Sequence, residues 1–235
     1  MGSEMCIRDS PCSEQAKWGQ YTHGLGAGDV NGDGRTDLLM AEGWWEQPGP
    51  ESKETWKKHP FAFGGGGAQM HVYDVDGDGD NDVITSLQAH GYGLSWFEHV
   101  KKDGEITFVP HAILPTAADQ NLDGVQFSQP HSVQVVDVNG DGLKDIITGK
   151  RYWAHGPKGD PDPGGPALLY WFELVRGDKG AADAEAAVKY VPHRIDDDSG
   201  VGTNFATGDL NGDGRLDIVI GNKKGGFVFL QEAAR

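Results

Sequence analysis

One nine-residue pattern, Asp-x-Asn/Asp-Gly-Asp-Gly-x-x-Asp, occurs four times along the chain, beginning at Asp29, Asp74, Asp137 and Asp209. Each copy places side-chain oxygens at positions one, three, five and nine, which suits a hard cation such as calcium. The glycine at position six permits the backbone conformation that folds the loop around an ion. The pattern therefore predicts four calcium-binding loops.

The predicted ligands occupy positions one, three, five, seven and nine, and position seven offers a backbone carbonyl as in EF-hand loops. They are Asp29, Asn31, Asp33, Arg35 and Asp37; Asp74, Asp76, Asp78, Asp80 and Asp82; Asp137, Asn139, Asp141, Leu143 and Asp145; and Asp209, Asn211, Asp213, Arg215 and Asp217. The second loop has Asp76 where the others have asparagine, so we expect it to bind calcium most tightly. No EF-hand is expected, because position twelve is never glutamate.

Recurring apolar and aromatic residues follow each loop. Extended apolar stretches such as Val83 and Ile84 come first, then an aromatic pair with a glutamate, then an aromatic residue with a histidine three positions later. The aromatic pairs lie at 44–46, 96–98 and 171–173, and the histidine pairs at 56–59, 108–111 and 190–193. The repeat therefore predicts four strands, and radial repetition of such sheets makes a β-propeller.

The strand, loop and strand unit resembles the FG-GAP or VCBS repeat of integrin-α-like calcium-binding propellers over most of residues 21–230. The resemblance implies an all-β fold, a β-propeller of four-stranded blades within residues 13–235. The expected blades are 21–62, 66–114, 126–196 and 200–235. Residues 1–12 are interpreted as a non-native or disordered tail. The four visible repeats would be the C-terminal part of a seven-bladed propeller if earlier blades are missing.

The chain carries 36 acidic and 20 basic residues, a formal net charge of -16. This charge argues against nucleic acid and anionic membranes as partners. Four bound calcium ions would neutralise about half of it. No apolar run predicts a membrane span, and the only helix-like run is 181–188. Both cysteines, Cys6 and Cys12, precede the predicted propeller.

The nine histidines differ in their place within the repeat. His59, His111 and His193 recur at one position of the fourth strand, so we interpret them as packing or hydrogen-bonding residues. Four others precede the first strand of a blade or follow its second strand, which places them at the end of the propeller opposite the calcium loops. They are His23, His90, His131 and His155. His71, three residues before its loop, is a further candidate.

Imidazoles gathered at a cavity mouth suit zinc or another transition metal. The favoured interpretation of these four histidines from sequence alone is still ordinary hydrogen bonding to loop backbone, because no short-range ligand spacing is present. The connection at 149–167 in the third blade is the longest of its kind and carries charged and aromatic side chains. Ligand-binding candidates near the histidine end are Tyr92, Arg151, Tyr152 and Trp153.

Three functions are compatible with these features. The preferred one is an exported ligand-binding module, extracellular or periplasmic, that binds carbohydrate or protein, because weak calcium loops fill at extracellular calcium concentrations. The alternative is a metal-assisted sugar lyase resembling the propellers of aldos-2-ulose dehydratases, with His23, His90, His131 and His155 as candidate catalytic residues. The third is a structural adhesion module. Whether the chain is an enzyme stays open, because the repeat indicates architecture and not activity.

Overall fold

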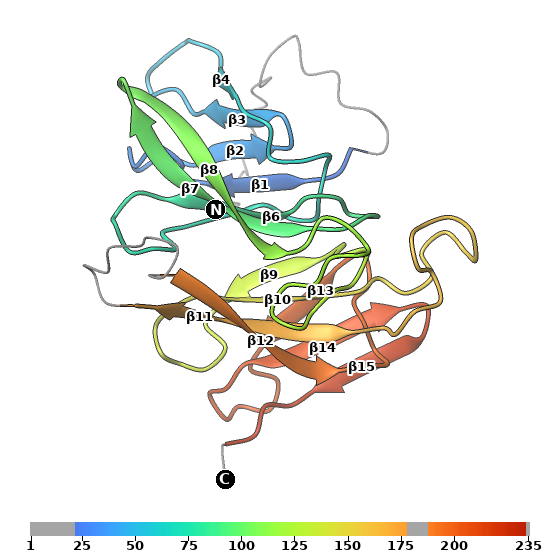
Figure 1. Cartoon of the computed structure of the whole chain (residues 1–235). Helices are drawn as coiled ribbons and strands as arrows, with labels where there is room; N and C mark the ends of the chain where they lie inside the picture. Colours follow the sequence, from blue (N-terminus) through green and yellow to red (C-terminus); the bar gives the residue numbers. More distant parts are fainter. Residues whose placement is uncertain (1–21, 178–187, 234–235) are drawn as a thin grey trace, which may run out of the picture.

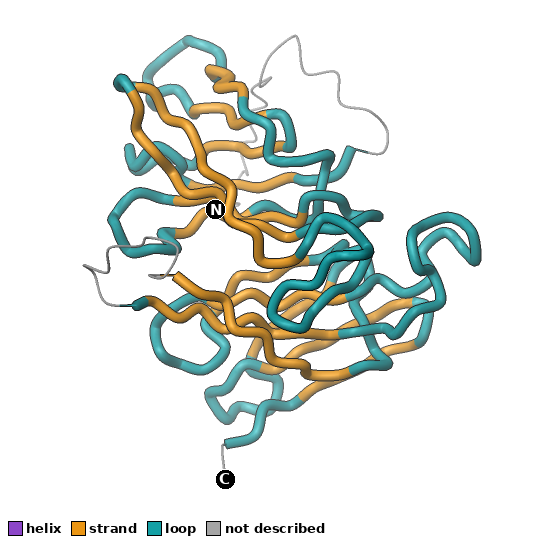
Figure 2. Tube along the Cα trace, viewed as in Figure 1, coloured by secondary structure: helices purple, strands orange, loops and turns teal. Residues whose placement is uncertain are grey.

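The computed structural model describes residues 22–177 and 188–233, and every regular element within them is a strand (Figure 2). Within these ranges no helix is long and apolar enough to cross a membrane. The strands are β1 (Leu25–Gly28), β2 (Asp37–Met40), β3 (Gly43–Glu46), β4 (Lys57–Pro60), β5 (His71–Tyr73), β6 (Asp82–Ser86), β7 (Leu94–Lys102), β8 (Glu105–Leu114), β9 (Val133–Val136), β10 (Asp145–Gly149), β11 (Leu169–Arg176), β12 (Val188–Asp196), β13 (Phe205–Gly208), β14 (Asp217–Asn222) and β15 (Gly225–Phe229).

These strands form four antiparallel sheets, each built from strands that follow one another along the chain (Figure 1). Their orders are β1-β2-β3-β4, β5-β6-β7-β8, β9-β10-β11-β12 and, among the described residues, β13-β14-β15. The arrangement confirms the predicted all-β propeller, and we call the sheets blades one to four. The expected tail at 1–12 lies outside the described residues, as does the helix-like run at 181–188 apart from Val188 in β12.

Apolar residues on both faces of the blades form the cores between neighbouring blades. Val83 and Ile84 are adjacent in β6, so their side chains point to opposite faces of the sheet. Val83 joins the cluster shared with blade one and Ile84 the cluster shared with blade three, and both are fully buried. A third cluster joins blades three and four through Ile147 and Ile218. This two-sided burial explains why the strands after the loops are continuously apolar.

A tryptophan, a histidine and a glutamate make the same contacts in blades one to three. Trp96 lies opposite His111 in the ladder of β7 and β8, and their rings stack with centroids 4.3 Å apart. His111 Nε2 lies 2.7 Å from Glu98 Oε2. The equivalent sets are Trp44, His59 and Glu46 in blade one and Trp171, His193 and Glu173 in blade three. The three recurring histidines therefore pack and hydrogen-bond within their blades, as predicted.

The strand order places the histidine candidates at one end of the molecule. In an up-and-down blade, the turn from the first to the second strand lies at one end of the sheet. The opposite end of the sheet holds the start of the first strand and the connection from the second to the third strand. Residues before β1 and β9 and the connections 87–93 and 150–168 therefore meet away from the aspartate loops.

Candidate functional site

The four aspartate loops have nearly the same internal hydrogen bonds. In the first loop, Asp29 Oδ1 accepts hydrogen bonds from the backbone N–H of Gly32 and Asp33 at 2.8 and 3.0 Å, and Oδ2 accepts from Gly34 at 2.8 Å. Gly32 and Gly34 have φ of 77° and 81°, a backbone conformation that side chains rarely adopt. Backbone N–H groups of each loop thus hold the carboxylate of its first aspartate in place.

The aspartate at position nine joins its loop to the third strand of its blade. Asp37 is fully buried, and its two carboxylate oxygens accept hydrogen bonds from the backbone N–H of Val30 and Gln47, both at 2.9 Å. Asp82, Asp145 and Asp217 make the equivalent pairs. Each oxygen retains a further lone pair for a cation. The sequence did not predict this second role, because the second partner lies ten or more residues away, in or just after the third strand.

The second loop brings three carboxylates close together. Carboxylate oxygens of Asp74, Asp76 and Asp78 all lie within 4.8 Å of one another. Burial raises the pKa of Asp82 to about 7, and the charges of Asp76 and Asp78 add to the effect. A divalent cation would offset this repulsion between carboxylates. The donor set, all oxygen, fits calcium better than a transition metal.

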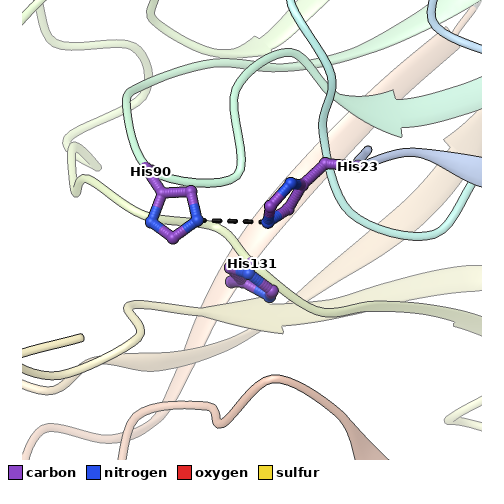
Figure 3. Close-up of side chains that lie close together, drawn as sticks. All are labelled: His23, His90 and His131. Carbon is purple, nitrogen blue, oxygen red and sulfur yellow. Dashed lines mark hydrogen bonds between the residues drawn. The ribbon is translucent and has the colours of Figure 1, made fainter. Parts of the chain in front are cut away.

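At the opposite end, three histidines from three different blades meet (Figure 3). His23 precedes β1, His90 lies between β6 and β7, and His131 precedes β9. His23 Nε2 lies 3.1 Å from His90 Nε2, and the ring centroids of the three residues are 4.9 to 5.2 Å apart. One ring nitrogen of each lies within 4.8 Å of one nitrogen of the other two.

Two of these imidazoles carry buried ring nitrogens without hydrogen-bond partners among the described residues, His90 Nδ1 and His131 Nδ1. Burial lowers the pKa of His131 to about 4, and the nearby charge of Arg151 contributes. Burial also lowers the pKa of His90. Both rings are therefore neutral near neutral pH, which is the form in which imidazole binds a metal.

A second group adjoins the first and shares His90. His155 Nδ1 lies 3.1 and 3.0 Å from the two carboxylate oxygens of Asp160. His90 Nδ1 lies 3.3 Å from Asp160 Oδ1, in a contact that is not a hydrogen bond. Burial alone would raise the pKa of Asp160, but the hydrogen bond and charge of His155 hold it below its usual value.

Two of the histidines, His23 and His90, border a cavity of about 590 Å³. His23, His90 and Asp160 contribute to its wall, together with Glu42 and Gln88. Glycine backbone at 65–66, 91 and 159 forms much of the remaining lining. The glycine run at 64–67 joins β4 to β5, and Gly65 and Gly66 within it line this cavity.

Gln129 connects the loops that carry the histidines. Its backbone N–H donates to Gly91 O at 2.6 Å, and its carbonyl accepts from the backbone N–H of His131 and Arg151 at 2.7 and 3.0 Å. Its side-chain amide donates to Pro161 O at 3.1 Å. Gln129 is fully buried and has φ of 60°, which is unfavourable for a residue other than glycine. Strained buried residues of this kind cluster at functional sites.

Lys150 fixes the segment that bears Asp160. Its side chain is 1% exposed, and its ammonium group donates to Ser128 Oγ at 2.8 Å, to Asp162 Oδ2 at 2.9 Å and to the carbonyl of Asp162. Ser128 Oγ in turn donates to Pro161 O at 2.9 Å. Neither Gln129 nor Lys150 was predicted as a site residue, because their partners are distant in sequence.

The other candidates lie apart from the histidine cluster or at its edge. His71 does not join it: His71 Nε2 lies 3.0 Å from Val133 O, so this histidine links blades two and three. Arg151 and Tyr152 line a smaller cavity of about 250 Å³ next to blade four. Trp153 is 41% exposed, and Tyr92 is half-buried beside Gly91.

Comparison with known families identifies the repeat. A model described as FG-GAP-like repeat matches residues 29–85 and 74–148, and an FG-GAP repeat model matches residues 201–230. These matches include all four aspartate loops. No curated protein matches the chain.

Proposed function

Since the chain belongs to the FG-GAP repeat family, we propose that it is a ligand-binding propeller whose site is the cavity beside His23, His90 and His131. Calcium in the four loops stabilises the blades, and a transition-metal ion held by the three histidines takes part in binding. The observation that carries this proposal is the meeting of three imidazoles from three separate blades at one point.

The geometry of the three imidazoles fits a zinc-like ion. Ligands about 2.0–2.1 Å from a tetrahedral ion lie about 3.3–3.4 Å from one another. The 3.1 Å between the Nε2 atoms of His23 and His90 is close to that spacing. Three protein ligands leave a coordination position open, as in catalytic rather than structural zinc sites. An exogenous ligand would complete the coordination from the cavity.

The cavity wall favours a polar ligand. Glu42, Gln88 and the glycine backbone offer hydrogen-bond donors and acceptors, and no Phe, Tyr or Trp is among the described residues that line it. Such a wall suits the hydroxyl groups of a carbohydrate or the polar groups of a protein loop. Export of the chain fits this function, because extracellular calcium concentrations fill weak calcium loops.

Elemental analysis tests the metal site. Purified full chain, dialysed against calcium with trace zinc, is expected to retain at least one transition-metal ion per chain besides calcium. His131→Gln should retain one such ion fewer than wild type and keep its calcium, because the aspartate loops lie at the other end of the blades. His111→Gln, in the stacking set of blade two, is the matched control and should keep both. Wild type without transition metal above background would refute the proposal.

A metal-assisted sugar lyase is the second candidate, favoured by the pairing of His155 with Asp160 at the edge of the same cavity. A carboxylate that holds an imidazole in one tautomer is a common arrangement for a general base. The bound metal would supply polarisation of a substrate carbonyl. Incubation of the zinc-loaded chain with an aldos-2-ulose, followed by NMR, tests this. Dehydration that disappears in His155→Gln supports the lyase, and no reaction favours the binding module.

A further inference from the structure

His90 places its two ring nitrogens in two different groups. Nε2 lies 3.1 Å from His23 Nε2, in the group with His131. Nδ1 lies 3.3 Å from Asp160 Oδ1, in the group with His155. Imidazole is a planar ring with its nitrogens on different edges, so an ion bound at Nε2 leaves Nδ1 available to another acceptor or ion.

The second group has the spacing of a coordination site. Asp160 Oδ1 lies 3.1 Å from His155 Nδ1 and 3.3 Å from His90 Nδ1, near the about 3.3 Å expected between ligands of a tetrahedral ion. One ligand atom of each of its three residues lies within 4.8 Å of the others. The ring centroids of His90 and His155 are 4.7 Å apart and the ring planes are inclined by 31°, and Nδ1 of each ring lies near the carboxylate of Asp160.

We propose that His90, His155 and Asp160 bind a second divalent transition-metal ion, and that the ring of His90 bridges it to the ion of His23 and His131. This inference rests on the proposed function, because it adds a position to the same site. The Asp160 side chain is only 5% exposed, so its negative charge lies in a poorly solvated position where a cation is favoured. Two nitrogens and one oxygen suit zinc, iron or copper better than calcium.

The backbone around Asp160 is held in place independently of any ion. Lys150 binds Asp162 through two contacts, and Pro161 O accepts hydrogen bonds from both Ser128 and Gln129. Asp160 therefore belongs to a fixed segment, and its carboxylate is preorganised for binding. A bridging His90 has no ring proton, so binding of the second ion releases one proton from the protein.

Titration of the metal-free full chain with zinc, in excess calcium to keep the aspartate loops filled, counts the ions. Wild type is expected to bind two zinc ions per chain, and Asp160→Asn and His155→Gln one each. His193→Gln removes an imidazole that lies outside both groups, in the stacked set of blade three, so this control should bind two.

Copper substitution tests the bridge. Two Cu(II) ions joined by one imidazole ring couple magnetically, so the electron paramagnetic resonance signal of wild type should fall when the second equivalent is added. In Asp160→Asn the signal should rise to one equivalent and stay. The second metal position would be overturned if wild type binds a single zinc ion and Asp160→Asn binds that ion at least tenfold more weakly. Asp160 would then be a carboxylate that only orients His90. Loss of all transition-metal binding in wild type would instead refute the proposed function.

Discussion

Individual histidines of this propeller have different roles, and each role depends on the surroundings of the ring. His111 stacks on Trp96 and bonds to Glu98, His71 bridges two blades, and His90 faces two groups of possible metal ligands. All are the same residue type, so the position within the repeat and the burial of the ring determine the role. Stability and metal binding can therefore be tested separately at this scale.

His71 is expected to make stability sensitive to acid. Burial lowers its pKa, and the charge of Lys144 adds to the effect, while the contact with Val133 O opposes it. Below about pH 6.5 the unfolded chain therefore binds a proton at His71 more readily than the folded chain does. The stabilisation from neutral His71 is present above that pH and is lost as pH falls. Urea unfolding between about pH 7.5 and 5 should show a weaker pH dependence in His71→Gln. An unchanged pH dependence would contradict this.

The stacked set of blade two is expected to contribute measurably to stability. His111→Ala removes the ring contact with Trp96 and the hydrogen bond to Glu98 and should cost roughly 1–2 kcal/mol. Val109→Ala in the same strand is the control, because Val109 is 43% exposed. Denaturant titration measures both, and equal effects of the two substitutions would argue against a specific role for the set.

At the scale of elements, the connection 150–168 is a structured part of the histidine site. Within it, Lys150 binds Asp162. Its partners outside come from two places: the segment at 128–129, and Lys223 of blade four, whose ammonium group donates to Trp153 O and Ala154 O at 3.0 and 2.6 Å. This connection contains no strand, and it is held by side chains together with single backbone contacts such as that from Arg151 N–H to Gln129 O. Side chains within it are therefore positioned by residues far away in sequence.

Lys150→Met tests this dependence. The substitution keeps an apolar stem of similar length and removes the ammonium group, and Asp162 is left in a solvent-exposed position (55% exposed). We expect the free energy of unfolding to change by less than about 1.5 kcal/mol. Zinc affinity should fall about tenfold, because the segment of Asp160 is no longer held. Calorimetric titration with zinc and thermal unfolding measure the two effects. A large loss of stability with unchanged zinc affinity would show that Lys150 only supports the fold.

The elements were more predictable from sequence than their contacts. Three patterns predict the strands and blades, because each is local and repeated. They are the aspartate loops, the apolar runs around Val83 and Ile147, and the recurring Trp and His positions. The same topology placed His23, His90, His131 and His155 at one end. The sequence did not predict that Gln129 and Asp160 belong to the site or that His71 lies outside it. These placements depend on backbone contacts across blades.

At the scale of the whole molecule, the loops link each blade to the next. Asn81 of blade two donates to Asp29 O at 2.7 Å, Arg176 of blade three to Val75 O at 2.8 Å, and Gln231 after blade four to Val138 O at 3.0 Å. Each acceptor is a backbone carbonyl of the preceding loop. An ion that orders the loop therefore also supports the contact between blades.

Calcium removal should accordingly destabilise the entire propeller. Each filled loop adds about 2.7 kcal/mol at a calcium concentration a hundredfold above its dissociation constant. Chelation should lower the melting temperature in one transition that involves all blades, and added calcium should restore it. Asp78→Asn in the second loop should reduce the calcium dependence more than Asn139→Ala in the third, because the second loop has one more carboxylate. An identical melting curve with and without calcium would contradict this.

The most direct test of the account is the position of bound metals in crystals of the full chain grown with calcium and zinc. Anomalous difference maps at the zinc absorption edge should show a peak in contact with His23, His90 and His131, and calcium should occupy the aspartate loops. No zinc peak at the histidines, or zinc only in the loops, would contradict the central claim that this propeller carries a transition-metal site opposite its calcium loops.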